Sequence, residues 1–254
     1  MENNLNPSFS IIIATSNSES TITECLKSIK TQTYQNFEII IIDNCSKDKT
    51  VEIIKNFNFK KIKIITEKDD GIYDAINKGI VNAKGDLVSI LHSNDLYFDN
   101  TVLSDIIDVF NKENIDIMYG NLIYVKKNNI ELTIRKWNSK NYITGLFHAG
   151  WNPPHPTFIV KRNTYLENKL YNNSLGNPAD IELMFRFLEI KNYKSFYLNK
   201  VLIKMRYGGA SNKNFVSIIK QNLVIIKFLK IDKNLLKLTF FLVSKFINRL
   251  KQFL

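Results

Sequence analysis

The sequence predicts an α/β fold with a central mixed, mostly parallel sheet, followed by C-terminal basic amphipathic helices. Three observations lead to this prediction. Apolar runs rich in Ile and Val lack the alternation of a half-exposed strand, which is typical of strands buried on both faces of a parallel sheet. Segments with helical spacing separate the first of these runs. Further along the chain, strand-like runs follow one another directly, which indicates an antiparallel part.

The first part of the chain contains four such runs, and we expect each to be a buried strand: FSIIIAT (9–15), FEIIIID (37–43), KIKIIT (61–66) and DLVSILH (86–92). Helical patterns lie between them. In the first, Thr21 and Glu24 have the spacing of a capping box, and Ile22, Leu26 and Ile29 share one face. The second and third patterns are TVEIIKNF and GIYDAINKGIVNAKG.

The second part of the chain has a different order of elements. After the helical pattern NTVLSDIIDVFNK come two strand-like runs, IDIMYGNLIYV and IELTIRKW, joined by the turn-prone KKNN. The long loop in GLFHAGWNPPHPTFIVKR leads into a strand, and a helix, ADIELMFRFLEI, and a strand, SFYLNKVLIKM, follow. No low-complexity linker interrupts these elements. We therefore predict one domain over residues 1–212 and a helical extension over 213–254.

The positive charge of the chain is concentrated in this extension. The chain has 35 Lys and Arg residues and 24 acids, for a net charge of +11. Residues 211–254 contain nine of the basic residues and one acid, whereas the first 210 residues contain 26 basic residues and 23 acids. In the second helical segment, Leu235, Leu242 and Phe246 share a stripe that the cations largely avoid, as in an interfacial helix on anionic lipid. We therefore expect an anionic membrane surface as a partner. The alternative is packing on the domain or on a second copy of the chain in a homo-oligomer. No nucleic-acid partner is expected.

Neither the cysteines nor the first residues suggest export. Cys25 and Cys45 have no CxxC spacing and no histidine cluster beside them, so neither a disulfide framework nor a zinc site is indicated. The stretch MENNLNPSFS lacks the basic and apolar regions of a secretory signal. The longest uncharged run of the last helix, LTFFLVS, is far too short to span a bilayer. The expected location is the cytoplasm, peripheral on the inner face of the cell membrane.

Polar residues follow all four predicted strands. In an open parallel sheet, ligands bind beyond the carboxyl ends of the strands. The ends here carry Thr15 to Asn17, Asp43, the acidic stretch from Glu67 to Asp70, and Asn94 with Asp95. Carboxylates at three of the four ends favour a site that reads hydroxyl and N–H groups or holds a hard cation. The stretch ATSNSESTI lacks a Gly-rich phosphate fingerprint, which argues against a dinucleotide-binding or P-loop site.

Two long blocks resemble a known family. The stretch IIIATSNSESTITECLKSIKTQTYQNFEIIIIDNCSKDKT resembles the opening of the family 2 inverting glycosyltransferases of GT-A fold. The stretch EKDDGIYDAINKGIVNAKGDLVSILHSND is similar to the segment that leads to the family's metal motif. Weaker matches are HPTFIVKR, ADIELMFRF and MRYGGAS, and together the matches cover about residues 8–212.

The resemblance implies transfer of a sugar from a nucleoside diphosphate donor to an acceptor hydroxyl, with inversion. Such a reaction needs a base for the acceptor and an electrophilic group for the departing diphosphate. By position, Asp180 matches the general base, although acids are also common in the first turn of a helix. Asp43 matches the residue that reads the nucleotide base. The other expected contacts to the nucleotide sugar are Thr15, Asn17, Asp69, Lys78, Asn94 and Arg206.

The metal motif of the family often has the form D-x-D-D, and this chain departs from it. The four positions are His92, Ser93, Asn94 and Asp95, so only the last carboxylate is present. Part of the family resembles N-S-G-D or N-S-D-D here. Mg2+ can bind through one protein carboxylate when phosphates and waters complete its shell. The resemblance therefore implies Mn2+ or Mg2+ on Asp95, held weakly without the donor, with His92 buried rather than a ligand.

Two further residues are candidates for the acceptor side. Trp151 is the aromatic residue that we expect to stack on a sugar ring, with core packing as the alternative. His155 is expected to face the acceptor or a phosphate, with a hydrogen bond to the backbone as the alternative.

The leading hypothesis is an inverting hexosyltransferase that adds one sugar to a lipid-linked oligosaccharide for a surface polysaccharide such as capsule, O-antigen or exopolysaccharide, with a UDP-sugar as favoured donor. A sugar nucleotidyltransferase would need a basic Gly-rich loop, which ATSNSES does not supply. A binding module without turnover is the third hypothesis. His92 and Asn94 favour it, and the retained Asp180 opposes it.

Overall fold

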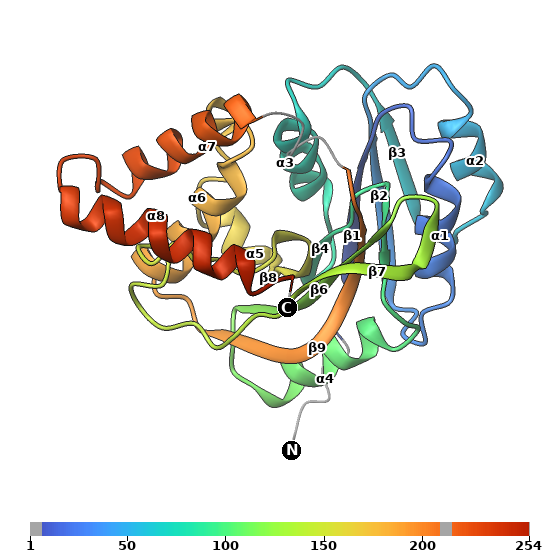
Figure 1. The fold of residues 1–254 in the computed structure, drawn as a ribbon. Coiled ribbons are helices and arrows are strands. Elements are labelled where there is room, and N and C mark those ends of the chain that lie inside the picture. Colours follow the sequence, from blue (N-terminus) through green and yellow to red (C-terminus); the bar gives the residue numbers. More distant parts are fainter. Residues whose placement is uncertain (1–6, 209–214, 254) are drawn as a thin grey trace.

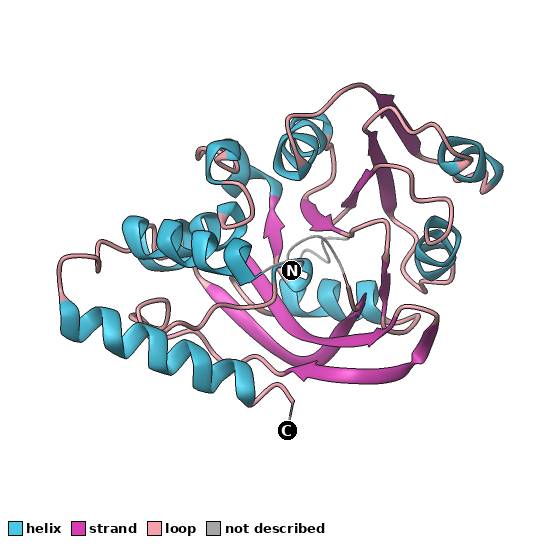
Figure 2. Cartoon of the chain, turned by 45° about the horizontal axis from the view of Figure 1, so that its top comes forward, coloured by secondary structure: helices cyan, strands magenta, loops and turns pink. Residues whose placement is uncertain are grey.

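The computed structural model describes residues 7–208 and 215–253. A curved mixed sheet lies between helices on both of its faces (Figures 1 and 2). The strand order is β3-β2-β1-β4-β8-β6-β9-β5, and β7 pairs with β6 beside this path. The predicted α/β class and the mixed, mostly parallel sheet are confirmed, with the parallel pairs concentrated in the first four strands.

The first four strands are parallel and lie where the sequence predicts them: β1 (Phe9–Thr15), β2 (Phe37–Asp43), β3 (Ile62–Thr66) and β4 (Leu87–Ile90). Their side chains enter two cores. Ile12 belongs to the core under α3 (Ile72–Asn82), whereas Ile11 and Ile13 belong to the core under α1 (Ile22–Lys30). Burial on both faces explains why these runs do not alternate. The second core also takes residues of α2 (Thr50–Asn56) and α4 (Val102–Lys112).

The capping box predicted for α1 is wrong. The helix begins at Ile22, but Thr21 makes no side-chain cap bond, and its hydroxyl donates to the Ser18 carbonyl at 3.4 Å. Glu24 instead forms an ion pair with Arg206, far away in the sequence. A tertiary contact therefore replaces the local one.

The rest of the sheet is mostly antiparallel, as the consecutive strand runs predict. It contains β5 (Asp95–Tyr97), β6 (Ile117–Lys126), β7 (Asn129–Trp137), β8 (Ile159–Lys161) and β9 (Ser195–Arg206). β8 joins β4 to β6 with antiparallel pairing on both sides, and β9 runs parallel to β6 and antiparallel to β5. The short helical elements of this part are η1 (His155–Thr157), α5 (Arg162–Leu166), η2 (Asn173–Leu175), α6 (Ala179–Phe185) and the π turn η3 (Arg186–Ile190).

The C-terminal helices α7 (Phe215–Phe228) and α8 (Leu235–Leu250) pack beside α6 (Figure 1). Ile225, Leu229 and Phe241 are buried in the same core as the residues of α6. The extension is thus joined to the preceding domain by a shared core. None of the described helices combines the length and the hydropathy needed to cross a membrane.

The outer face of α8 is apolar. Its most exposed large apolar residues are Leu235 (77%), Leu236 (83%), Phe240 (58%) and Phe246 (63%). A helix on the surface of a soluble domain normally directs its apolar face inward. In α8, Phe241 is buried, but the other residues that face the protein include Lys245 and Asn248.

Candidate active site

The ends of β1 and β2 lie side by side, as the parallel pairing predicts. Thr15 is paired with Asp43, which is fully buried. The Asp43 carboxylate accepts hydrogen bonds from the backbone N–H of Ser46 at 3.0 Å and from the Ser46 hydroxyl. The Thr15 hydroxyl is buried without a partner among the described residues. This end of the sheet therefore holds an oriented carboxylate beside an unused hydroxyl.

Asn17 connects the two strand ends. Its φ of +47° is in the left-handed region. Its backbone N–H donates to the Ser46 hydroxyl at 2.8 Å, and its side-chain oxygen accepts from the Lys47 N–H at 2.9 Å. Asn17 therefore shapes the loop that follows Asp43.

Lys78 and Asp69 are brought together at the next strand end. The Lys78 ammonium lies 2.7 Å from Asp69, 3.0 Å from Glu67 and 3.0 Å from Asp74. The hydrogen bonds to these carboxylates, that to Asp69 first, raise the Lys78 pKa above its usual range. The Asp69 N–H donates to the Asn44 side chain at 3.1 Å, which ties this cluster to the end of β2.

Asp95 begins β5 and is fully buried. Neither of its carboxylate oxygens has a partner among the described residues, and the same is true of Nδ1 of His92. Burial raises the Asp95 pKa to about 8, and the backbone N–H of Arg206 and then its charge oppose this shift. Burial lowers the His92 pKa to about 4, so this ring is neutral at pH 7.

These features fit a divalent cation held through one protein carboxylate. The described residues contain no group of three or more His, Cys, Asp or Glu suited to a metal. A buried carboxylate without partners is disfavoured as an anion, and a divalent cation would supply the missing positive charge. Phosphate and water ligands would have to complete its shell.

Arg206 does not line the cavity described below. Its side chain is 3% exposed, forms the ion pair with Glu24, and donates to the Asn94 carbonyl at 2.7 Å. Arg206 therefore holds the loop that carries Asn94 and Asp95. Asn94 itself is half-buried at the end of this loop. The second Gly and the Ser of the turn after Arg206 lie outside the described residues.

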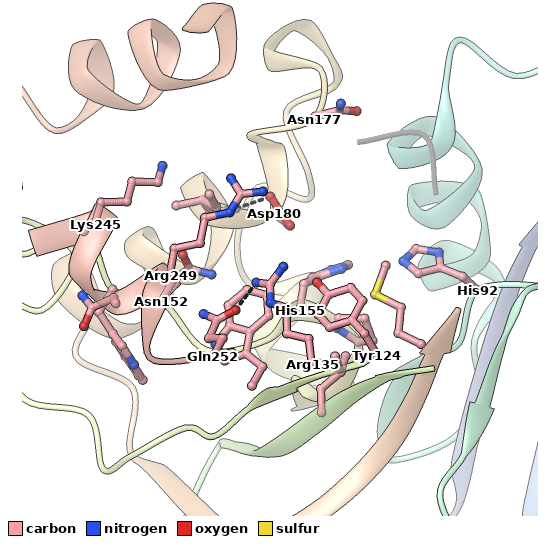
Figure 3. A pocket seen from close by; sticks show the side chains of 18 of the residues that line it. His92, Tyr124, Arg135, Asn152, His155, Asn177, Asp180, Lys245, Arg249 and Gln252 are labelled. Atoms are coloured by element: carbon pink, nitrogen blue, oxygen red, sulfur yellow. Dashed lines mark hydrogen bonds between the residues drawn. The ribbon is translucent and has the colours of Figure 1, made fainter. Parts of the chain in front are cut away.

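A cavity of about 350 Å3 opens between the sheet, α6 and α8 (Figure 3). His92 lies at one side, Asp180 near the middle, and Lys245 and Arg249 of α8 at the other side. Trp151 and His155 also line it, so the two candidate acceptor contacts and the candidate base share one cavity.

Asp180 lies in the first turn of α6. One of its oxygens accepts from the Ile181 N–H at 2.7 Å. Burial raises the Asp180 pKa to about 7, and the hydrogen bond to Ile181 and the charge of Lys245 limit this shift. A carboxylate with a pKa near neutrality is suited to take a proton at physiological pH.

His155 and Trp151 each pack against other aromatic side chains at the cavity. Nε2 of His155 is hydrogen-bonded to the Tyr171 hydroxyl at 2.9 Å. Burial lowers the His155 pKa to about 3. Tyr73 stacks on Tyr171 with ring centroids 5.3 Å apart. Trp151 is 7% exposed and meets Tyr119 edge-on at 6.2 Å. Trp151 thus belongs to the core and presents one side to the cavity.

Sequence analysis missed three cations of this cavity. Lys245 and Arg249 are one helical turn apart on α8, and Arg135 comes from β7. The Arg135 guanidinium lies 4.5 Å from the centre of the Tyr124 ring. The cations off the apolar stripe of α8 were the available signal, but nothing in the sequence shows that they turn toward Asp180.

Comparison with known proteins identifies the family. The model of Glycosyl transferase family 2 matches residues 10–188. An uncharacterized glycosyltransferase of Rickettsia typhi is 29% identical over 226 residues, which cover 84% of this chain and 68% of that protein. A PGL/p-HBAD biosynthesis glycosyltransferase of Mycobacterium tuberculosis is 33% identical over 211 residues, or 81% of this chain and 80% of that protein.

Solved structures show the same fold. TarS of S. aureus in complex with UDP has a TM-score of 0.65 at 20% identity, over 90% of this chain and 67% of that chain. The mannosyltransferase PcManGT of Pyrobaculum calidifontis, in complex with GDP-Man and Mn2+, has a TM-score of 0.63 at 17% identity, over 96% and 70%. Because the family model matches well over half of the chain, the protein belongs to glycosyltransferase family 2 and has the GT-A fold.

Proposed function

We propose that this protein is an inverting glycosyltransferase in which Asp180 is the general base. The observation that carries the proposal is the position of Asp180, a carboxylate of the cavity whose pKa is raised to about 7. Asp180 accepts the proton of the acceptor hydroxyl as this oxygen attacks the sugar. A direct attack opposite the departing diphosphate inverts the configuration of the anomeric carbon.

The donor is a nucleoside diphosphate sugar that binds across the strand ends. Asp43, with Thr15 and Asn17 beside it, holds the nucleoside, and Asp69, Lys78 and Asn94 lie along the same edge of the sheet. Arg206 acts by holding the loop of Asn94. The solved structures of similar fold support this donor class, because TarS is found in complex with UDP and with UDP-GlcNAc, and PcManGT with GDP-Man. A UDP-sugar is the favoured donor, and a hexose the favoured group.

Asp95 holds Mn2+ or Mg2+. When bound, the ion supplies positive charge for the departing diphosphate. Asp95 contributes one buried carboxylate, and His92, three residues before it, is neutral at pH 7. The Mn2+ in the complex of PcManGT supports this proposal.

The acceptor is a lipid-linked glycan at an anionic membrane surface. Trp151 and His155 contact its sugar beside Asp180. The exposed apolar face of α8 and the excess of cations in residues 211–254 support membrane attachment, because an interfacial helix combines these two features. The proposed location is the cytoplasmic face of the cell membrane, and the proposed product is a precursor of a surface polysaccharide. A second copy of this chain is the competing occupant of that face.

A panel of UDP-, GDP- and dTDP-sugars tests the proposed function. Purified protein is incubated with each donor and Mn2+, and release of the nucleoside diphosphate is measured. We expect release from one class of donor, with slow hydrolysis in place of transfer when no acceptor is present. If nucleotides bind but no donor is ever turned over, with or without a lipid extract as acceptor source, the binding-module hypothesis replaces this one.

A further inference from the structure

We propose that Lys245, Arg249 and Arg135 form an anion subsite that binds the phosphate group of a lipid-linked acceptor inside the active-site cavity. This inference rests on the proposed function, and it adds both a site and a chemical requirement for the acceptor. The acceptor must carry an ionised phosphate or diphosphate between its sugar and its lipid.

The first argument is the charge of the cavity. Its charged lining residues are these three cations and one acid, Asp180. None of the three cations belongs to a salt bridge within the described part of the chain. The Lys245 ammonium donates to the neutral side chain of Asn222 at 2.7 Å. The cavity therefore has a surplus of positive charge that an anionic ligand would neutralise.

The second argument is the burial of Arg135. Its side chain is 7% exposed, and its Nε is buried without a partner in the described structure. One terminal nitrogen donates to the neutral Gln252 side chain, and the guanidinium packs on Tyr124. A buried guanidinium with an unused donor and no counter-ion is costly. Arginine binds phosphate through several donors at once, so a phosphate in the cavity would satisfy this group.

The third argument is position. Figure 3 shows His92 on one side of Asp180 and the cations Lys245 and Arg249 on the other. The strand ends proposed for the donor lie on the His92 side, because His92 is the second residue after the end of β4. Lys245 and Arg249 are thus placed beyond the base, on the side proposed for the acceptor, and Arg135 lies between them and His92.

The fourth argument is that α8 carries both kinds of contact. Lys245 and Arg249 line the cavity, whereas Phe246 and Leu250 of the same helix are 63% and 49% exposed. A lipid-linked phosphate has the same two parts, an anion and an apolar chain. With the outer face of α8 in the lipid, the phosphate of such an acceptor reaches the half-buried Lys245 and the exposed Arg249 within the width of one helix, about 10 Å.

The test uses soluble probes and does not depend on turnover. Geranyl diphosphate, geraniol and inorganic pyrophosphate are titrated by calorimetry in metal-free buffer, and UDP is titrated with Mn2+. The chain has two tryptophans, and both of them, Trp137 and Trp151, line the cavity, so a change in tryptophan fluorescence locates the binding there. The variant is Lys245→Gln/Arg249→Gln. The control is Lys237→Gln/Lys251→Gln, which removes the same charge from exposed positions of the α8 region that do not line the cavity.

We expect the cavity variant to bind geranyl diphosphate at least about 10-fold more weakly, a loss of about 1.4 kcal/mol. Its affinity for UDP should stay within about twofold, and the control should match the wild type for every probe. Geranyl diphosphate should also bind the wild type more tightly than geraniol or pyrophosphate, because it offers both the anion and the chain.

Three results would overturn the inference. In the first, UDP loses as much affinity as geranyl diphosphate, which would assign the cations to the donor. In the second, the control variant weakens binding of geranyl diphosphate equally, which would attribute the loss to the lower net charge of the protein rather than to a subsite. In the third, pyrophosphate binds as tightly as geranyl diphosphate, which would make this a site for free phosphate. If geranyl diphosphate binds as expected but no sugar donor is turned over, the anion subsite stands and the proposed transferase activity fails.

Discussion

The backbone of Gly150 lies directly against Lys245 of α8. A Cβ atom on Gly150 would be 2.5 Å from the Lys245 Cβ, and Gly150 has a φ of +65°. The Asn248 side chain donates to the neighbouring Ala149 carbonyl at 3.2 Å. The loop before Trp151 therefore packs against α8. The position of Lys245 in the cavity depends on this contact, and the contact requires a glycine at position 150.

Substitution Gly150→Ala should loosen this docking. We expect a loss of about 1–3 kcal/mol in the free energy of unfolding, because the new methyl group meets α8 and the backbone is strained. Hydrogen exchange in α8 should become faster. Gly145→Ala is the control, since Gly145 also has a positive φ, +92°, but has nothing within 4 Å of its Cβ position. Equal exchange in α8 for both variants would show that the contact does not hold the helix.

The pH dependence of transfer should report Asp180. At saturating Mn2+ and acceptor, we expect the rate to fall about tenfold per pH unit below pH 7 and to be level above it, because the base must be ionised. The nearby charge of Lys245 lowers the Asp180 pKa, so the acidic limb should move to higher pH in Lys245→Gln. A limb near pH 4, or no movement in the variant, contradicts this assignment.

Asp95→Asn should stabilise the metal-free protein while abolishing metal binding. The Asp95 pKa is about 8 in the folded chain and about 4 in an unfolded one, so its ionisation destabilises the folded state increasingly between these pH values. The variant should therefore gain more at pH 8 than at pH 5. A gain of about 1 kcal/mol corresponds to about 2–4 °C in Tm.

Thermal unfolding of the wild type and the variants also supplies the controls for Asp95. In EDTA, the exposed Asp108→Asn should leave Tm unchanged at both pH values. With Mn2+ and UDP added, the wild type should gain Tm and Asp95→Asn should not. A wild-type gain that Asp95→Asn retains would place the ion elsewhere.

The outer face of α8 should bind anionic vesicles. Phe246→Asp/Leu250→Asp should release the protein from phosphatidylglycerol vesicles in a sedimentation assay, because charge on this face opposes insertion. Leu132→Asp/Ile143→Asp, at exposed apolar positions elsewhere, is the control. Removing the helices altogether would delete Ile225 and Phe241 and expose the residues of α6 in the same core, such as Leu183 and Met184, so substitutions are the cleaner test. If the α8 variant still binds vesicles but a dimer dissociates, the face belongs to a second copy.

The sheet and the strand-end site could be predicted because they depend on local patterns. The Ile-rich runs without polar alternation form strands that are buried between two cores. The parallel pairing of β1 with β2 places Thr15 beside Asp43. Four polar strand ends could therefore be assigned to one edge of the sheet from order alone.

The parts that could not be predicted depend on tertiary contacts. Glu24 fits a local capping box, but it pairs with Arg206, and this contact takes Arg206 away from the cavity. The stripe of α8 was visible, but a stripe does not say which side meets the protein. The structure turns Lys245 inward and Phe246 outward, the reverse of an ordinary surface helix.

Donor turnover by Asp180→Asn tests the central claim most directly. Glu182→Gln is the matched control, because Glu182 lies in the same turn of α6 but binds Arg186 at 2.9 Å. With the donor that the wild type uses, we predict a loss of about 100-fold or more in sugar transfer for Asp180→Asn, unchanged affinity for the nucleotide, and near wild-type transfer for Glu182→Gln. Wild-type transfer by Asp180→Asn, or an equal loss in both variants, would contradict the assignment of Asp180 as the base.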